Sequence, residues 1–265
     1  MRRLRLLALA LLGIPCTALG QTKLPLDTGY DHAALAHYPA PAAFSGPSAT
    51  ADDYWTKVAS YEPPAPGAAV APAWVLDIST AGWPSMVGNS RWIGPSPVHA
   101  SAAGTKPPDP AYSLFRKCFC LLRGFRDPRL SFRLHGDDRV QVWLNSVTTT
   151  LAGPADGLTA AGLSGATANL GDFRTGVNCL YVLVEDHHGM NMGFNLSGTV
   201  EAWGLMPIVG KGPGVSFEPR ACGGASPPGA AAAADRAALA AIGGIAMRRR
   251  VEPHADKASD RSGRR

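Results

Sequence analysis

Charged residues are scarce in this chain, and long apolar or helical stretches are scarcer still. Asp, Glu, Lys and Arg make up 17% of its 265 residues, against about 25% in an average protein. This low content argues against a coiled coil and against a charged disordered chain. No window of about 12 residues in the body of the chain shows helical periodicity. Gly and Pro are abundant instead, with 30 and 23 residues, and such a composition favours short strands joined by turns.

The sequence motifs of the common enzyme classes are also missing. The chain has no Gly-x-Ser-x-Gly, His-Glu-x-x-His or Gly-x-x-x-x-Gly-Lys-Ser/Thr motif, and no spacing singles out two carboxylates for glycoside hydrolysis. His187 and His188 are adjacent, so on an extended chain they point to opposite faces, and we interpret them as surface-loop residues. We therefore predict that the protein is not an enzyme. Charged groups that converge in a cleft with perturbed pKa values would argue against this prediction.

The first twenty residues predict export. Arg2, Arg3 and Arg5 precede an unbroken apolar run over residues 6–14, and small residues at positions 18 and 20 form a cleavage site. This is the pattern of a secretory signal peptide at residues 1–20. A membrane anchor needs about 20 apolar residues, and this run has about half that length. We expect an extracellular or periplasmic protein without a stable transmembrane anchor.

The positive charge of the chain is concentrated at its two ends. The net charge is +5 overall, but residues 21–220 hold 14 basic and 16 acidic residues, a net charge of −2. No basic patch interleaved with aromatic residues occurs there, so we expect no nucleic-acid partner. Residues 206–265 are rich in Gly, Pro and Ala and are basic, which predicts a disordered tail.

Alternating polar and apolar residues predict an all-β domain over residues 74–205. Such period-2 alternation, bounded by Gly, Asp, Asn and Pro, is typical of half-buried antiparallel strands in a β-sandwich or barrel. The inward-facing sets that it predicts are Phe115, Phe119 and Leu121, then Val140, Val142 and Leu144, and then Leu180, Val182 and Val184. Residues 21–73 are rich in Pro and Ala, and we expect an irregular N-terminal segment that packs on this domain.

Five segments of this domain resemble a known family. They span residues 112–121, 130–134, 136–145, 173–180 and 192–200. Their order is similar to that of the galactose-binding-like jelly rolls found as carbohydrate-binding modules and accessory domains of secreted bacterial proteins. In that family a run D-D-x-x-x-V-x-L-N-G is followed by G-x-N-x-L-x-V-x-V, and here the first run ends in Leu144-Asn145-Ser146. The resemblance implies a jelly-roll β-sandwich and carbohydrate binding, but it transfers no binding residue.

Tryptophan and asparagine supply the candidate ligand contacts. Sugars present apolar C–H faces that stack on aromatic rings, and their hydroxyls bond to short polar side chains. Trp143 alternates with inward-facing residues, so its ring points away from the core unless a second layer covers it. Trp83 flanks a loop. We name Trp143, Trp83 and Asn145 as candidate glycan contacts. Packing or a domain interface is the alternative for the two tryptophans.

Asp137 and Asp138 lie between two predicted strands. Asp side chains at such positions bond to nearby backbone amides and stabilise turns, which is our main interpretation. The alternative is a bound Ca²⁺, because hard cations prefer several oxygen ligands. We expect no other cofactor.

Four cysteines remain outside the predicted signal peptide: Cys118, Cys120, Cys179 and Cys222. An exported protein keeps disulfides, and four cysteines allow three pairings. Cys118 and Cys120 share one strand face, opposite Phe119, so a bridge from one of them to Cys179 and from the other to Cys222 is compatible with the geometry. The Cys-x-Cys spacing does not suit a zinc site.

These patterns together predict a monomeric, exported, non-catalytic domain that binds an extracellular or cell-wall glycan. The alternative is a structural or adhesive surface domain without a small ligand, and a hydrolase ranks third.

Overall fold

The protein is built from antiparallel β-strands. The computed structural model describes residues 21–38, 51–62, 65–67, 71–76, 83–85, 87–95, 111–187, 192–206, 222 and 240. The expected signal peptide and most of the expected tail lie outside these residues. Besides the strands, the described part contains a 3₁₀ helix, η1 (Leu170–Asp172), and it includes no helix that is long and apolar enough to span a membrane.

Within the described residues, eleven strands form one sheet and two short strands form another. The large sheet consists of β1 (Gln21–Pro25), β4 (Ala51–Glu62), β5 (Ala65–Gly67), β6 (Ala71–Val75), β7 (Ile93–Gly94), β8 (Ala111–Asp137), β9 (Arg139–Leu144), β10 (Thr150–Asp156), β11 (Leu163–Thr167), β12 (Gly176–Asp186) and β13 (Gly193–Met206). Its main strand order is β1-β13-β7-β6-β4-β8-β12-β9-β10. β2 (Tyr30–Asp31) and β3 (Ala36–His37) pair with each other.

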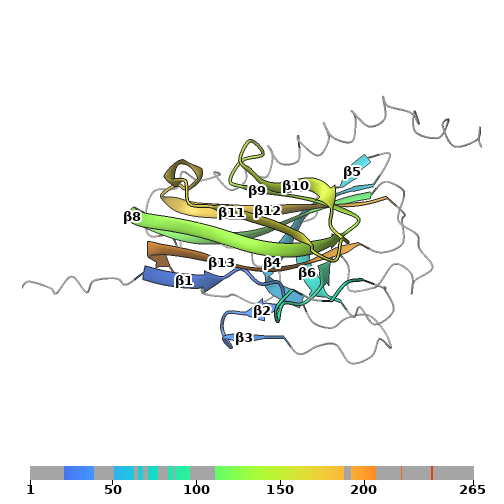
Figure 1. Cartoon of the computed structure of the whole chain (residues 1–265), viewed down its shortest axis with the longest axis horizontal. Coiled ribbons are helices and arrows are strands. Elements are labelled where there is room, and N and C mark those ends of the chain that lie inside the picture. The colour runs from blue at the N-terminus through green and yellow to red at the C-terminus, as the bar shows by residue number, and fades with distance from the viewer. Residues whose placement is uncertain are drawn as a thin grey trace, which may run out of the picture.

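Strand β8 belongs to two groups of strands. Its first half, as far as Leu121, pairs with β12 and β4, whereas its second half pairs with β11 and β13. The end of β13 also pairs with Leu121 and Cys120. Gly124 and Asp127 between the halves have positive φ angles of 79° and 50°, and the pairing with β13 shifts register nearby. Such irregularities increase the local twist of a strand. Figure 1 shows β8 running along the molecule, with β9 and β12 above it and β13 and β1 below it.

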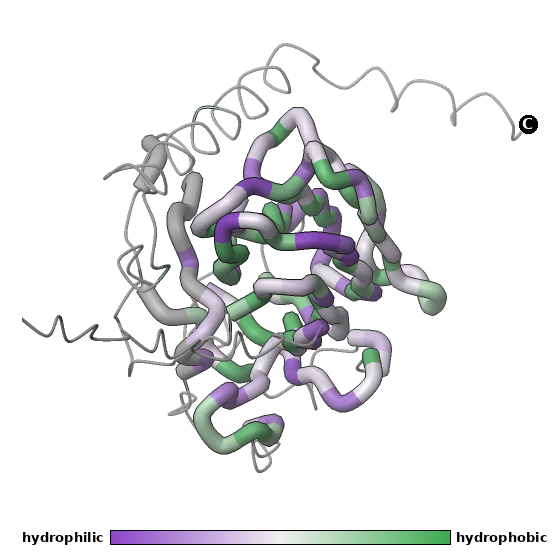
Figure 2. The backbone as a smooth tube through the Cα atoms, turned by 90° about the vertical axis from the view of Figure 1, so that its left-hand side faces the viewer, coloured by the Kyte–Doolittle hydropathy of each residue, from purple (hydrophilic) through white to green (hydrophobic). Residues whose placement is uncertain are grey.

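The main hydrophobic core lies on one face of these strands. The side chains that β8, β9 and β12 bury in it include all three predicted inward sets: Phe115, Phe119 and Leu121; Val140, Val142 and Leu144; Leu180, Val182 and Val184. Apolar residues of β13 and β1 complete the core from the other group of strands. The predicted alternation is therefore confirmed. In Figure 2, short hydrophobic and hydrophilic stretches alternate along the chain.

A second hydrophobic cluster covers the opposite face of β8, β9 and β12. It contains Tyr112, Leu114, Cys118, Cys120, Trp143, Val177, Cys179, Tyr181, Leu183 and Cys222. All eleven residues of β12 are consequently buried. We expected a half-buried strand, but Leu180 to Val184 is a continuous apolar and aromatic run, and such a run is typical of a strand with both faces covered.

The N-terminal segment departs from our prediction. We expected residues 21–73 to be irregular, yet β1 pairs with β13 and β4 pairs with β8. Neither strand shows clean polar–apolar alternation, and β1 is an edge strand that ends at Pro25. An edge strand such as β1 tolerates such a sequence. The formation of both strands depends on their pairing partners rather than on a local pattern.

Burial of both faces of β12 predicts a stability effect on the outer face. Leu183 is 4% exposed and lies in the second cluster. We expect Leu183→Ala to lower the free energy of unfolding by about 2–4 kcal/mol, because it removes buried methyl groups and leaves a cavity. Urea denaturation would measure the change. Leu170→Ala, at a side chain that is 58% exposed, is the matched control with an expected effect below about 0.5 kcal/mol. Equal effects of the two variants would contradict the described packing.

Candidate functional site

Several acidic residues meet where three strands begin or end. Asp137 is the last residue of β8, and Asp138 separates it from β9. Glu185 and Asp186 are the last residues of β12, and the backbone N–H of Asp138 donates to the carbonyl of Glu185 at 2.8 Å. Gly193, the first residue of β13, lies opposite Asp137. The pairing of β8, β12 and β13 therefore brings together two acidic pairs that are far apart in sequence.

Trp83 joins this acidic cluster from a distant loop. Its indole Nε1–H donates to Asp137 Oδ2 at 2.6 Å. The Trp83 ring stacks on Trp92, with centroids 4.2 Å apart and an interplanar angle of 28°. Trp92 is fully buried, whereas Trp83 is half-buried. The structure thus brings one predicted glycan contact, Trp83, into direct contact with one of the predicted metal ligands.

Asp137 and Asp138 form a carboxyl pair. Burial raises the pKa of Asp137 to about 8, and the hydrogen bond between the two carboxyl groups and the nearby negative charges act in the same direction. The N–H of Trp83 opposes this shift. At neutral pH Asp137 is therefore mostly protonated and acts as a donor toward Asp138. Asp138 Oδ2 also accepts the backbone N–H of His187 at 2.7 Å.

Glu185, in this acidic cluster, contacts two other side chains. Its Oε1 accepts the Tyr112 hydroxyl at 3.1 Å and lies 3.0 Å from Nε2 of His187. The His187 side chain is 35% exposed, in agreement with a surface-loop position, whereas His188 lies outside the described residues. Glu185 was not among the residues predicted from the sequence. The available signal was an acidic pair, Glu185-Asp186, at the end of a predicted strand.

The calcium alternative for Asp137 and Asp138 gains no support from this geometry. Within the described ranges, no group of three or more His, Cys, Asp or Glu residues is arranged to hold a metal ion. A Ca²⁺ site needs about six oxygen ligands. Here Asp137 Oδ2 accepts an indole N–H, and Asp138 accepts a backbone N–H. Both contacts join the two aspartates to distant segments rather than to the amides of their own turn, so the turn-stabilising role remains a prediction.

Trp143 does not lie in the candidate site. It is 1% exposed and packs in the second cluster, stacked on Tyr181 with centroids 5.9 Å apart. Our prediction that it contacts a glycan is corrected, and the packing alternative holds. The physical reason is that Trp143 packs among the side chains of the second cluster, on the face of β9 opposite the main core.

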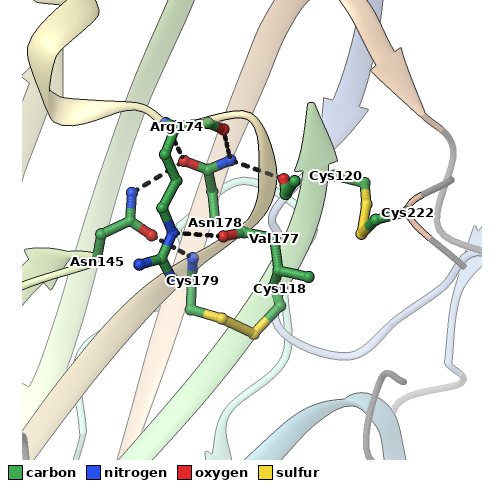
Figure 3. Close-up of a disulfide and its surroundings, with 9 residues drawn as sticks. Cys118, Cys120, Asn145, Arg174, Val177, Asn178, Cys179 and Cys222 are labelled. Carbon is green, nitrogen blue, oxygen red and sulfur yellow. Dashed lines mark hydrogen bonds between the residues drawn. A yellow bond between two sulfur atoms is a disulfide. The ribbon is translucent and has the colours of Figure 1, made fainter. Parts of the chain in front are cut away.

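Asn145 has a structural role that differs from the predicted glycan contact. Its φ angle is +60° in the turn after β9, a conformation that Asn tolerates better than most residues. Its Nδ2 donates to Asp172 O and Asn178 Oδ1, both at 2.9 Å, and its Oδ1 accepts the backbone N–H of Cys179 at 2.9 Å. Figure 3 shows Asn145 facing Asn178 beside the disulfide. Both ends of the amide group are thus engaged within the protein.

Two disulfides bridge the second cluster. Cys118 pairs with Cys179 and Cys120 pairs with Cys222, which confirms the expected use of the Cys-x-Cys pair (Figure 3). Cys118 and Cys179 lie directly opposite each other on β8 and β12, with Cα atoms 4.1 Å apart. Both backbone polar groups of Cys179 bond to Asn145. The two cysteines therefore form a non-hydrogen-bonded pair, in which side chains approach closely.

Comparison of the chain with protein-family models, with curated proteins and with solved structures finds no match. The chemistry of the site is therefore argued from its residues alone. It combines a half-buried aromatic ring, a protonated carboxyl group, a carboxylate and a partly exposed imidazole.

The raised pKa of Asp137 predicts a specific pH dependence of stability. In the unfolded chain this carboxyl has an ordinary pKa near 3.8, whereas in the folded protein it stays protonated up to about pH 8. Its contribution to the free energy of unfolding is therefore largest at acidic pH and decreases as the pH rises from about 4 to 8. In Asp137→Asn the side chain is an amide, which does not ionise in this pH range. We expect wild type to lose stability relative to this variant between pH 5 and 8.5 in denaturant titrations.

The exposed Asp156 supplies the control for this measurement. Asp156→Asn is expected to leave the wild-type pH profile of stability unchanged in shape. If wild type and Asp137→Asn run parallel over the whole range, Asp137 is not protonated in the folded protein and the carboxyl pair is misassigned.

Proposed function

We propose that the protein is an exported, non-catalytic domain that binds a glycan at the site formed by Trp83, Asp137, Asp138 and His187. The observation that carries the proposal is the half-buried Trp83 ring, held by its N–H on Asp137 and stacked on buried Trp92. An aromatic face beside a few polar groups is a common composition of ligand sites. The ring offers an apolar surface to sugar C–H groups, and the neighbouring polar side chains offer partners for hydroxyls.

The proposed fold is a jelly-roll β-sandwich of the galactose-binding-like type. In support, β8 contributes to two groups of antiparallel strands, and apolar residues from both groups share one core. The order of the sequence segments that resemble this family is a second argument. The proposed export rests on the predicted signal peptide, and the two disulfides are in keeping with an oxidising compartment.

The raised pKa of Asp137 is the one observation that favours a hydrolase instead, because such groups occur at catalytic sites. In glycoside hydrolases, however, the two catalytic carboxyl groups lie about 5–5.5 Å or 6.5–9.5 Å apart. Asp137 and Asp138 are hydrogen-bonded to each other, which leaves no room between them for a glycosidic bond. We therefore keep the non-catalytic proposal.

Glycan binding by variants of Trp83 tests the proposal. We expect saturable binding of the purified protein on a glycan array, and a loss of affinity of at least tenfold in Trp83→Ala, because the aromatic face is removed. Trp83→Phe keeps a ring but loses the N–H that bonds to Asp137, and we expect it to retain most of the affinity. Addition of calcium or a chelator is expected to change neither result.

Trp203 supplies the matched control. It is a second half-buried tryptophan, located at the far end of β13 beside Arg126, and Trp203→Ala is expected to bind as wild type does. Circular dichroism and thermal unfolding verify that each variant is folded. Absence of glycan binding by the folded wild type would overturn the proposal in favour of a structural or adhesive domain. Release of reducing sugar ends from a bound glycan would favour the hydrolase.

A further inference from the structure

The hairpin formed by β2 and β3, residues 30–37, is separate from the large sheet. Its two strands pair only with each other in the described strand pairings, and residues 33–36, in the turn and at the start of β3, are exposed. Figure 1 shows it below β1 and β13, outside the main sheet. A unit held in this way can open without breaking the ladder hydrogen bonds of the large sheet.

Side-chain contacts hold much of this hairpin in place. Asp31 Oδ1 accepts the backbone N–H groups of Ala33 and Ala34 at 2.8 and 3.1 Å. The hydroxyl of Tyr54, on β4, donates to Asp31 Oδ1 at 3.4 Å and accepts the N–H of Ala33 at 3.1 Å. His37 Nε2 lies 2.9 Å from Asp27 Oδ2. Opening the hairpin therefore costs these polar contacts and the packing of its aromatic rings.

His32 lies at the buried side of the hairpin. It is 9% exposed, and its ring packs edge-on against Tyr54 at 4.5 Å and Tyr30 at 5.0 Å between centroids. Its Nε2 atom is buried and has no hydrogen-bond partner. A proton on Nε2 would place a cation in this aromatic environment without an acceptor, which is unfavourable.

A buried lysine faces the same space from β8. Lys117 is 1% exposed, its Nζ donates to Asp27 O at 3.2 Å, and it lies 5.9 and 5.8 Å from the ring centroids of Tyr54 and Trp55. Burial lowers the pKa of Lys117 to about 8, while the negative charges of Asp52 and Asp27 oppose the shift. Lys117 is therefore largely cationic at neutral and acidic pH, and it repels a protonated His32.

Asp52 is the carboxylate of β4 in this cluster. It is 1% exposed, its Oδ2 accepts the N–H of Gly29 at 2.6 Å, and its Oδ1 accepts those of Tyr54 and Trp55 at 3.0 and 3.1 Å. Both carboxylate oxygens are thus occupied by backbone donors. Burial raises the pKa of Asp52, against the attraction of Lys117 and these backbone donors.

Protonation of His32 is linked to opening of the hairpin. Burial, and to a lesser extent repulsion from Lys117, lowers the pKa of His32 from its ordinary value of 6.5 to about 3 in the closed protein. An open hairpin exposes the ring and restores its ordinary pKa. Because the open form then binds the proton more tightly, acid favours opening between about pH 6.5 and 3, by up to tenfold per pH unit. Above pH 6.5 this contribution is absent.

We propose that the hairpin at residues 30–37 is an acid-opened latch: protonation of His32 ejects its ring from between Tyr30 and Tyr54, and the hairpin leaves the side of the sheet that carries Lys117. The latch is independent of the proposed glycan site, which lies on other residues. It makes the protein's surface differ between neutral and mildly acidic surroundings.

Hydrogen exchange of the purified protein, followed by mass spectrometry between pH 7 and 4, tests this latch. The quantity compared is the protection factor, which corrects each exchange rate for the intrinsic pH dependence. We expect protection of residues 30–37 in wild type to fall below that in His32→Phe, by close to tenfold per pH unit below pH 6.5. Phe preserves an aromatic ring without a titrating nitrogen. Asp52 acts in the opposite direction, because its raised pKa favours the closed form in acid, but both proteins contain it, so their difference isolates His32.

His37→Gln is the matched control on the same hairpin. This variant loses the contact with Asp27, so we expect lower protection at every pH with the same acid-dependent fall. Parallel profiles of wild type and His32→Phe would overturn the proposal, as would loss of the acid response in His37→Gln, which would assign it to His37. An equal fall in the protection of β12 would show global rather than local opening and would also overturn it.

Discussion

The register of β8 is the constraint on which both the main core and the second cluster depend. This strand is 27 residues long, and it pairs with β12 and β4 in its first half and with β13 and β11 in its second. Successive side chains of a strand point to opposite faces, so a shift by one residue would exchange the two faces. Phe115 and Phe119 would then leave the main core, and Cys118 and Cys120 would lose their partners. The register of this one strand therefore determines the core and both disulfides.

Strand β8 also carries two ionisable groups whose pKa values are shifted by burial. Lys117 lies on the inner face of β8, between Phe115 and Phe119, and Asp137 lies at its end. Burial of such groups is unfavourable unless hydrogen bonds or a shift in protonation compensate for it. Asp137 is mostly protonated and accepts the Trp83 N–H, whereas Lys117 donates to Asp27 O. Each compensating hydrogen bond connects β8 to a distant loop, one at Asp27 and one at Trp83.

The proposed glycan site and the proposed latch use different chemistry. The first needs an exposed aromatic face and polar groups that meet a ligand, and it is built where β8, β12 and β13 begin or end. The second needs a buried imidazole without an acceptor, and it lies under a hairpin outside the large sheet. Because the two share no residue, a variant at Trp83 and a variant at His32 report on separate properties of the protein.

The sequence by itself determined the strand faces, since alternation is a local property that each strand carries in its own residues. The inward sets of β8, β9 and β12 and the use of the Cys-x-Cys pair could therefore be predicted. Contacts between distant segments could not. Burial of Trp143 requires the other side chains of the second cluster, and strands β1 and β4 require their pairing partners. The Trp83–Asp137 hydrogen bond joins residues 54 positions apart. His32 also carries no local sign of its environment, because the absence of an acceptor at Nε2 results from how β2, β4 and β8 pack. Only the tertiary structure decided these features, because a side chain's burial and partners depend on which segments meet.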